Sequence, residues 1–520
     1  MVGEWGWTAD IVARRAAVTP GRQVIHDARL GRWFTYGELN ERANKLAWYL
    51  LETLQLRRGD RIAFLGQNGV EHIDLLLAAA RTGLALQPLN LRLSVSEMNV
   101  ILGQTQPSVV FYDSFYTETV SRLDIPFVNA LVHLRGKQAA DGQSVSYEAK
   151  IMEKGRGLPV GYRGSPEDPL LLLGTGGTTG LPKTAVISQQ AVYWNALNEI
   201  LSWGVSEKDR APNILPLFHT GGWQLLTLPL LFAGGRIFLS PNFDPEATLR
   251  LIEREHCTLL FGAPTMFKMM ADLPMFKGTN LSSLRMAMAG AAPCPREIME
   301  PYWDKGIKFV KGYGLTEAGP HNLSMLWGGL SETLIKEKWE SVGVPFLYTR
   351  TRIVDEAGQD VKQGDVGELI FSGPQIFSGY WGNERATLES LRNGWVYTGD
   401  LARQDEEGFY YIVGRKKDMF ISGGENVYPI EVEQLINKHP AVLESAVIGV
   451  PDEKWGEVGM AFVVLKNGAK SKEEEIMAAC QGQLAKYKVP KHVVFVPELP
   501  RSSIGKVLKR ELQEQARRFH

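Results

Sequence analysis

The chain has 520 residues, and its 57 Lys and Arg residues against 58 Asp and Glu residues give a formal net charge of −1 at pH 7. Such a balance provides no general attraction to nucleic acid or to an anionic lipid surface. Hydrophobic residues make up 44% and charged residues 22%, which excludes a mainly disordered chain and predicts a globular protein of roughly three domain-sized units.

The N-terminus carries the charged residues Glu4, Asp10 and Arg14 where a signal peptide would need an apolar run. The longest apolar stretch, residues 221–235, is too short to span a bilayer. Three cysteines, far apart in the sequence, exclude a disulfide scaffold and indicate a reducing compartment. We therefore expect a cytoplasmic protein with no transmembrane segment and no nucleic-acid partner. A peripheral contact with a membrane and a homodimer stay open.

The first half of the chain predicts alternating helices and strands. A capping box at Thr35 and Glu38 predicts the start of a helix whose apolar positions recur at helical spacing. Residues 61–65 predict a buried strand, and residues 72–82 predict the helix after it. The pattern continues with predicted strands at 170–173, 214–217, 236–239, 259–261 and 286–288. This alternation predicts an α/β fold with doubly wound sheets.

The pattern changes near residue 341, where short strands separated by turns begin. We expect a large N-terminal domain over residues 1–416, in which residues 341–413 form a mainly β subdomain. A basic patch at 415–417 precedes further helices and strands, which predict a small, mobile α+β C-terminal domain over residues 417–520. Charge and glycine cluster at this boundary, as they do in linkers between domains.

A loop rich in glycine and threonine follows the predicted strand at 170–173. Residues 174–183 read Gly-Thr-Gly-Gly-Thr-Thr-Gly-Leu-Pro-Lys. Glycines allow the tight backbone that presents N–H groups to oxyanions, the threonines add hydroxyl donors, and Lys183 adds a cation. Because Pro182 precedes the lysine, the spacing departs from that of a kinase-type P-loop. We predict a phosphate-binding loop, with an ordinary glycine turn as the alternative.

This loop and further segments resemble, in sequence order, the acyl-adenylate-forming enzymes, which include acyl-CoA synthetases, peptide-synthetase adenylation domains and luciferases. The matching segments are 175–183, 216–222, 312–317, 367–371, 379–381, 397–400, 414–418 and 500–506. The resemblance implies that ATP activates a carboxylate as acyl-AMP with release of pyrophosphate, and that the acyl group then passes to a thiol. Such a site needs positive charge and orientation rather than a nucleophilic side chain.

The resemblance assigns the phosphates of ATP and Mg²⁺ to particular residues. Thr316 would contact the α-phosphate, and Glu317 would hold Mg²⁺, a cation that takes oxygen ligands. The β- and γ-phosphates would lie on the loop residues Thr175, Gly176, Gly177, Thr178, Thr179, Gly180 and Lys183.

The resemblance also assigns the adenosine. Tyr313 would lie against adenine, and Asp400 would accept hydrogen bonds from the ribose hydroxyls, with Arg415 in support. The alternative for Asp400 is an ordinary turn residue. The residues expected around adenosine are Gly290, Ala291, Ala292, Gly312, Tyr313, Gly314, Asp400 and Arg415.

Lys506 would bridge the carboxylate and the α-phosphate during adenylation, as the resemblance implies. The alternative is a solvated lysine in a basic tail. The resemblance also implies that the C-terminal domain rotates about Lys417 between the two half-reactions. Ser422, Gly423 and Gly424 would then line the tunnel for the pantetheine arm of CoA. Trp455 matches a position that contacts the CoA nucleotide, although a core role is equally plausible.

His219 bears on the choice of acid. It stands where amino-acid-activating members carry an aspartate for the substrate ammonium, so an α-amino acid is disfavoured. His219 would line or gate the acyl pocket, with a buried core histidine as the alternative. We assign catalysis to Lys506, Thr316, Glu317 and His219. The expected pocket residues are His219, Gly221, Gly222, Trp223, Phe261 and Gly319.

We therefore predict an acid–thiol ligase that uses ATP, Mg²⁺ and CoA on a small-molecule carboxylic acid. Gly176 and Trp223 match features of fatty acyl-CoA synthetases, so a medium- or long-chain fatty acid is the expected substrate. A core role for Trp223 is the alternative. Other functions left open are an aryl-CoA ligase for benzoate or cinnamate derivatives, an acyl-AMP ligase that delivers to a carrier protein, a non-catalytic nucleotide sensor, and a phosphotransferase that would release ADP.

Overall fold

The computed structural model describes residues 10–134, 145–153, 164–175, 183–325, 331–481, 483–501 and 507–517. The chain forms two compact units. The first comprises Met1–Thr351 and Phe371–Val396, and the second comprises Arg352–Ile370 and Tyr397–His520. This division and the predicted boundary after residue 416 place residues 352–370 and 397–416 differently, and that boundary stays a prediction.

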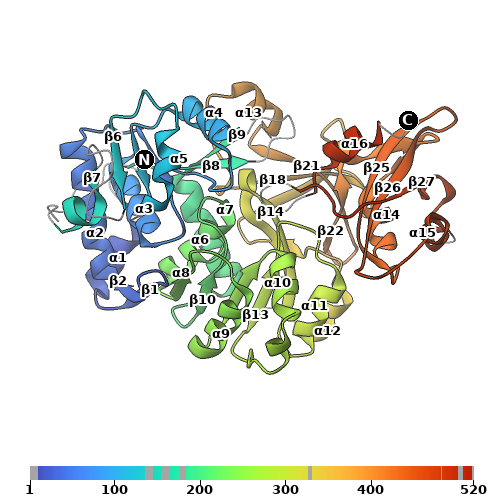
Figure 1. Ribbon diagram of the computed structural model, residues 1–520, viewed down its shortest axis with the longest axis horizontal. Coiled ribbons are helices and arrows are strands. Elements are labelled where there is room, and N and C mark those ends of the chain that lie inside the picture. Colours follow the sequence, from blue (N-terminus) through green and yellow to red (C-terminus); the bar gives the residue numbers. More distant parts are fainter. Residues whose placement is uncertain are drawn as a thin grey trace. The chain divides into compact units, whose positions relative to one another are not determined.

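Three β-sheets with helices packed against them build the first unit (Figure 1). In the largest sheet the strands from β8 to β7 run parallel, and β9 and β19 add antiparallel pairs at one side. Its strand order is β19 (Gly379–Tyr380), β9 (Lys183–Ser188), β8 (Pro169–Thr175), β4 (Ala85–Pro88), β3 (Arg61–Leu65), β5 (Val109–Tyr112), β6 (Ala130–His133), β7 (Val145–Ser146). The predicted α/β class is confirmed.

The other two sheets of this unit also have parallel centres. One has the order β10 (Arg210–Asn213), β11 (Arg236–Leu239), β1 (Gln23–Asp27), β2 (Arg32–Thr35). The other has the order β12 (Leu259–Gly262), β13 (Met286–Ala289), β14 (Phe309–Leu315), β15 (Gly319–Ser324), β16 (Val344–Pro345). Since β12, β13 and β14 are parallel, their carboxyl ends lie at one edge, where open α/β sheets bind ligands.

The helices described in the first unit lie between these strands in the sequence. They are α1 (Ile11–Val18), α2 (Tyr36–Trp48), α3 (Val70–Thr82), α4 (Val95–Thr105), α5 (Thr117–Ser121), α6 (Gln189–Trp203), α7 (Thr220–Gln224), α8 (Thr227–Ala233), α9 (Pro245–Glu255), α10 (Pro264–Ala271), α11 (Arg296–Trp303), α12 (Glu332–Glu337) and α13 (Glu384–Ser390). The predicted capping box is confirmed at α2: the Glu38 carboxylate accepts from the Thr35 N–H at 2.8 Å, and the Glu38 N–H donates to the Thr35 hydroxyl at 3.2 Å.

The strand predicted at 214–217 is wrong. The strand there is β10, Arg210–Asn213, at the edge of its sheet, where Pro212 can be accommodated. Residues 214–217 are irregular because the Asn68 side chain forms hydrogen bonds with their backbone groups. Its amide donates to the Leu215 carbonyl at 2.9 Å and accepts from the Leu217 N–H at 2.8 Å.

A fourth sheet is built from strands that lie between residues 350 and 415. Its order is β17 (Arg350–Val354), β18 (Gly367–Ser372), β21 (Trp395–Gln404), β20 (Leu391–Arg392), and β22 (Tyr410–Arg415) pairs with β21. The division by units falls within β17, β18 and β21. The mainly β subdomain expected over residues 341–413 stays a prediction.

The C-terminal part of the second unit is an α+β fold built on one five-stranded sheet. The order is β24 (Glu425–Val427), β23 (Phe420–Ser422), β26 (Gly456–Leu465), β25 (Val442–Asp452), and β27 (His492–Phe495) pairs with β26. Alternate residues of β25 serve opposite faces: Val447 packs in a cluster with α14 (Pro429–Ile436) and α15 (Glu473–Cys480), and Ile448 packs in a cluster with α16 (Lys509–Ala516).

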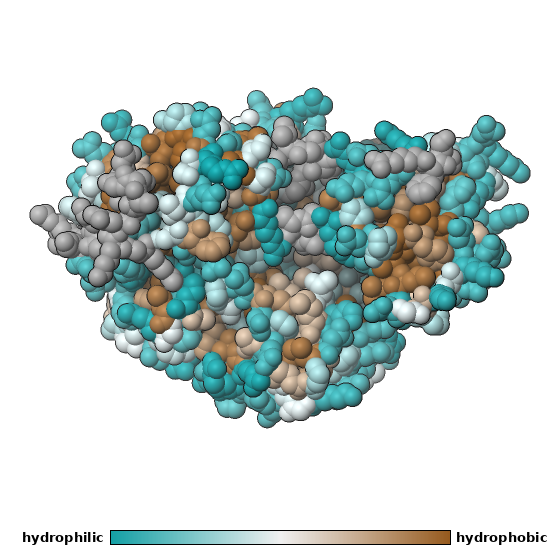
Figure 2. Space-filling model, viewed as in Figure 1, coloured by the Kyte–Doolittle hydropathy of each residue, from teal (hydrophilic) through white to brown (hydrophobic). Residues whose placement is uncertain are grey.

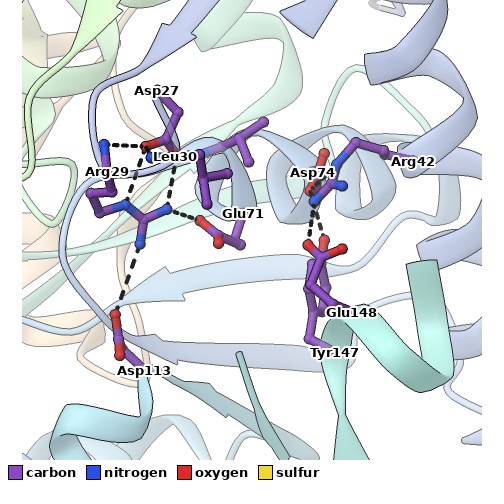
Figure 3. A network of polar contacts seen from close by, with 10 residues as sticks. Asp27, Arg29, Leu30, Arg42, Glu71, Asp74, Asp113, Tyr147 and Glu148 are labelled. Atoms are coloured by element: carbon purple, nitrogen blue, oxygen red, sulfur yellow. Dashed lines mark hydrogen bonds and ion pairs between the residues drawn. The ribbon is translucent and has the colours of Figure 1, made fainter. Parts of the chain in front are cut away.

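Two networks of charged side chains, most of them buried, join elements of the first unit (Figure 3). Arg29 donates to Asp27 and Glu71 and pairs with Asp113. Arg42 pairs with Asp74 and Glu148, and the Tyr147 hydroxyl donates to Asp74 at 2.7 Å. Glu71 and Asp74 both belong to α3, which is buried along its whole length. A buried charge requires a partner, and each acid of this helix has one.

Polar side chains cover most of the face drawn in Figure 2, and apolar side chains form separate patches on it. Among the helices of the described residues, none combines the length and the apolar character needed to cross a membrane. A peripheral contact with a membrane stays a prediction.

Candidate active site

The ends of the predicted phosphate loop are held side by side by the β8–β9 ladder. The two antiparallel strands pair as far as Thr175 and Lys183, and the Thr175 hydroxyl donates to the Lys183 carbonyl at 3.4 Å. The ladder therefore fixes the points where the loop leaves and rejoins the sheet. The loop residues Gly176, Gly177, Thr178, Thr179 and Gly180 lie outside the described residues, and their phosphate role stays a prediction.

The segment from Gly312 to Gly319 reverses the chain between β14 and β15. Thr316 and Glu317 lie in a single 3-10 turn, Thr316–Ala318, where Thr316 is buried and Glu317 is partly exposed. Two glycines are required by this geometry. A Cβ at Gly314 would lie 2.3 Å from the Pro320 carbonyl oxygen, and Gly319 has a φ of +81°. The turn thus places the Thr316 hydroxyl and the Glu317 carboxylate directly after the end of β14.

Tyr380 joins these two parts of the site. It lies in β19, opposite Ala185 of β9, and its hydroxyl donates to Glu317 Oε1 at 2.7 Å. Lys183 Nζ lies 5.0 Å from the centre of the Tyr380 ring, within the range of a cation–π contact. Burial, and then the Glu317 carboxylate, raise the pKa of Tyr380 well above its usual range, so its hydroxyl is protonated at neutral pH.

The sequence did not identify Tyr380 as a site residue. It lies in the matching segment 379–381, but 63 residues separate it from Glu317. The pairing of β19 with β9 and the hydrogen bond from the Phe377 N–H to the Glu317 carbonyl bring the two together.

Glu317 fits the requirements of Mg²⁺. Oε1 is held by Tyr380, and Oε2 has no hydrogen-bond partner among the described residues. Within the described part of the chain, no group of three or more His, Cys, Asp or Glu residues could hold a metal ion. Mg²⁺ at nucleotide sites is typically bound by one or two carboxylates together with substrate phosphates and water. A single carboxylate beside a predicted phosphate loop agrees with that pattern.

The expected adenine loop lies at the carboxyl edge of β13. The Gly290 N–H donates to the Gly262 carbonyl at 3.2 Å, which ties the loop to the end of β12. Ala291 has a φ of +69°, a conformation that alanine rarely adopts and that is common at ligand sites. The Tyr313 ring lies 6.0 Å from that of Phe371. Gly290–Ala292 and Tyr313 therefore lie near the carboxyl ends of the neighbouring strands β13 and β14, and their adenine role stays a prediction.

The acyl-side residues fall into two groups. His219 caps α7, and its Nδ1 accepts from the Gly221 N–H at 3.3 Å; a Cβ at Gly222 would lie 2.3 Å from the Pro216 carbonyl oxygen. His219 is partly exposed, whereas Gly221, Gly222, Trp223 and Phe261 are buried.

The two buried aromatic residues pack against other rings. Trp223 is 0% exposed, and the centre of its ring lies 5.9 Å from that of His72. Phe261 is 2% exposed, and the centre of its ring lies 4.3 Å from that of Trp203. Their positions fit core packing, and their predicted role in a pocket stays untested.

A buried His321–Glu199 pair lies next to these aromatic residues and was missed from sequence. Nδ1 of His321 lies 2.9 Å from Glu199 Oε1, and its ring contacts Trp203 and Phe346. Burial raises the pKa of Glu199, and His321 opposes that shift. Since 122 residues separate the partners, no local pattern indicates the pair.

In the second unit, the predicted ribose residues lie together. Asp400 and Arg415 are cross-strand partners of β21 and β22, and Arg415 Nε lies 3.0 Å from Asp400 Oδ1. Asp400 is buried. A carboxylate accepts hydrogen bonds, as the predicted ribose role requires, and that role stays a prediction. Lys417 lies in the next turn, Lys416–Asp418, where burial lowers its pKa. Its role as a hinge stays a prediction.

The predicted CoA residues also lie together in the second unit. Ser422, Gly423 and Gly424 form the turn between β23 and β24, and the Gly423 N–H donates to the Trp455 carbonyl at 2.8 Å. Gly423 has a φ of +62°, and a Cβ there would lie 2.5 Å from the Trp455 ring. Lys491 Nζ lies 5.6 Å from the centre of the same ring. Lys506 lies outside the described residues, between Arg501 and Val507, which form a β-bridge.

Comparison with known proteins defines the class to which this fold and site belong. Residues 12–381 match the profile described as "AMP-binding enzyme", and residues 431–506 match "AMP-binding enzyme C-terminal domain". ATP-bound MatB from Rhodopseudomonas palustris has the same fold, with a TM-score of 0.88 and 32% identity over 98% of both chains. The chain belongs to the AMP-binding enzyme family.

Individual relatives cover nearly the whole chain. It is 39% identical to a feruloyl-CoA synthase from an Amycolatopsis species over 502 residues, 96% of this chain and 97% of that protein. It is 37% identical to an indoleacetate–CoA ligase from Aromatoleum aromaticum over 505 residues, 97% of each protein. The chain is an AMP-forming acid–thiol ligase, and its cosubstrates and cofactor are ATP, CoA and Mg²⁺.

Proposed function

We propose that this ligase converts an aromatic carboxylic acid, ATP and CoA into an aryl-CoA thioester, AMP and pyrophosphate. The identity to a feruloyl-CoA synthase over 96% of the chain carries the proposal, and the similarity to an indoleacetate–CoA ligase supports it. Both names denote aromatic acids. An aromatic acid, which the sequence left open as an alternative, therefore replaces a fatty acid as the proposed substrate.

The two features that favoured a fatty acid give that reading little support. Trp223 is fully buried and packs near His72, which agrees with its alternative role in the core. Gly176 lies outside the described residues. Neither feature therefore distinguishes an acyl tunnel from an aryl pocket.

Two displacements make up the proposed reaction. First, a carboxylate oxygen attacks the α-phosphorus of ATP; a P–O bond forms as the bond to pyrophosphate breaks. Then the sulfur of CoA attacks the acyl carbon, the C–O bond to AMP breaks, and the thiol proton is released. Both steps depend on orientation and on stabilisation of negative charge.

The described residues supply groups suited to these steps. Lys183 and Thr175 lie at the ends of the phosphate loop, and Glu317 would hold Mg²⁺, which neutralises phosphate charge when bound. The Asp400 carboxylate, which pairs with Arg415, is suited to accept hydrogen bonds from the ribose hydroxyls. His219, rather than an aspartate, follows Phe218, so this position lacks the carboxylate that amino-acid-activating members use for the substrate ammonium.

A panel of acids tests this proposal. AMP and pyrophosphate release are measured with hydroxycinnamic, arylacetic, octanoic and palmitic acids, each with and without CoA. We expect kcat/KM for the best aromatic acid to exceed that for either fatty acid by at least about tenfold, the discrimination that a mismatched apolar pocket provides. A fatty acid that equals the best aromatic acid would contradict the proposal.

The same panel separates the remaining alternatives. Acid-dependent pyrophosphate release without a CoA thioester would indicate delivery to a carrier protein. ADP in place of AMP would indicate a phosphotransferase, and nucleotide binding without turnover would indicate a sensor.

A further inference from the structure

We propose that Tyr380 is a positioning residue for adenylation: its hydroxyl orients the Glu317 carboxylate for Mg²⁺, while its ring flanks Lys183 at the end of the phosphate loop. The inference rests on the adenylation chemistry of the proposed function and adds a residue to it. It concerns how this chain links β9, the strand that follows the phosphate loop, to the Glu317 carboxylate, which would hold Mg²⁺.

The backbone around Tyr380 is bonded to both parts of the site. The Phe377 N–H donates to the Glu317 carbonyl at 2.9 Å, which anchors the turn that carries Glu317. On the other side of Tyr380, the Trp381 N–H donates to the Thr184 carbonyl at 2.8 Å, next to Lys183. Residues 377–381 therefore connect the turn that carries Glu317 with β9, the strand that follows the phosphate loop.

The conformation of Tyr380 is fixed from its own side as well. Its N–H donates to the hydroxyl of Thr387, in the middle of α13, at 2.8 Å. Gly379 has a φ of +133°, and a Cβ there would lie 2.7 Å from Thr387 Cγ2, so only glycine allows this close approach. Hydrogen bonds from the backbone N–H groups of Phe377, Tyr380 and Trp381 thus fix the segment that carries the Tyr380 hydroxyl.

The hydrogen bond leaves one oxygen of Glu317 for a cation. Tyr380 donates to Oε1 at 2.7 Å, and Oε2 has no hydrogen-bond partner in the described ranges. Groups that hydrogen-bond a metal-binding carboxylate fix its orientation, and their loss typically costs 10–100-fold in metal affinity or activity. The Tyr380 hydroxyl has the geometry of such a group.

The test is Tyr380→Phe, which keeps the ring beside Lys183 and removes only the hydroxyl. The affinity for ATP is measured by calorimetry in Mg²⁺ and in EDTA. We expect an unchanged affinity in EDTA and a Mg²⁺-dependent gain in affinity that is about tenfold smaller than in the wild type. The Mg²⁺ concentration for half-maximal acid-dependent pyrophosphate release should rise by a similar factor, while thioester formation from supplied aryl-AMP should not change.

Tyr302→Phe is the matched control. The Tyr302 hydroxyl is buried and donates to the Phe267 carbonyl at 2.9 Å, so this variant loses a comparable bond outside the site. It should lower the melting temperature without changing the response to Mg²⁺. In a Glu317→Gln background, Tyr380→Phe should cause no further loss of the Mg²⁺-dependent affinity.

An unchanged response of Tyr380→Phe to Mg²⁺ would overturn the inference. So would an equal loss of ATP affinity in EDTA and in Mg²⁺, because that would show a structural role. Failure of the proposed function gives a different result: wild-type protein that binds MgATP but releases no pyrophosphate with any aromatic acid.

Discussion

Replacement of Lys506 by alanine should stop acyl-AMP formation while leaving thioester formation from supplied acyl-AMP. The family resemblance places this ammonium between the carboxylate and the α-phosphate, where two negative groups must approach. Loss of one preorganised group that stabilises transition-state charge typically lowers kcat by about 10²–10³-fold. Acid-dependent pyrophosphate release measures the first half-reaction, and conversion of synthetic aryl-AMP to aryl-CoA measures the second.

Arg510→Ala is the control for this prediction. Arg510 is close to Lys506 in sequence, but its side chain is 67% exposed and pairs with Glu514 one helical turn away. Surface pairs of this kind contribute little, so both half-reactions should keep their rates. Adenylation that survives in Lys506→Ala, or that falls equally in both variants, would remove Lys506 from the catalytic set.

Replacement of Arg29 by methionine should strongly destabilise the first unit. The Arg29 side chain is 6% exposed, and it pairs with Asp27 and Glu71, which are 0% and 3% exposed (Figure 3). Methionine keeps most of the volume but leaves the carboxylates buried without their cation. Breaking a buried pair in this way costs about 3–5 kcal/mol of the free energy of unfolding. Urea denaturation at pH 8 measures the loss.

The pH dependence of this loss has a defined sign. In the wild type, burial opposes ionisation of Asp27, but bonds from Arg29 and from the Val70 N–H hold its pKa below the usual value. Its stabilising contribution is therefore complete above its unfolded pKa and is lost only as the pH falls through the lower folded value. Burial raises the pKa of Glu71 even with Arg29 present.

Without Arg29, the folded pKa of both acids rises above the unfolded value. Such groups are destabilising when ionised, so the deficit of Arg29→Met should be larger at pH 8 than at pH 5. Arg32→Met is the control: Arg32 is 52% exposed, pairs with Glu38, and should change stability by less than about 1 kcal/mol. Equal losses in the two variants would contradict the role assigned to Arg29.

The elements that sequence predicted correctly depend on groups close together in the chain. Thr35 and Glu38 satisfy each other's backbone within one turn, so the start of α2 is visible locally. The strand predicted at 214–217 failed because a side chain distant in sequence, Asn68, takes the backbone hydrogen bonds that a neighbouring strand would have taken. Apolar runs alone cannot reveal such a partner.

The same distinction holds for the site. The glycines, Lys183 and the segment around Glu317 stand in continuous motifs, and the resemblance could be recognised from them. Tyr380 and the His321–Glu199 pair depend on pairing between distant elements, which the motifs do not encode. The choice between fatty and aromatic acids depends on the shape of a pocket built from several elements, and relatives informed that choice where single residues such as Trp223 did not.

The fate of the carboxylate oxygen tests the adenylation chemistry most directly. A hydroxycinnamic acid labelled with ¹⁸O in both carboxylate oxygens is incubated with the enzyme, MgATP and CoA, and the products are analysed by mass spectrometry. Attack of the carboxylate on the α-phosphorus predicts AMP that carries one ¹⁸O, a thioester that keeps the other, and unlabelled pyrophosphate. Unlabelled AMP, or ¹⁸O in inorganic phosphate together with ADP, would contradict an acyl-AMP intermediate.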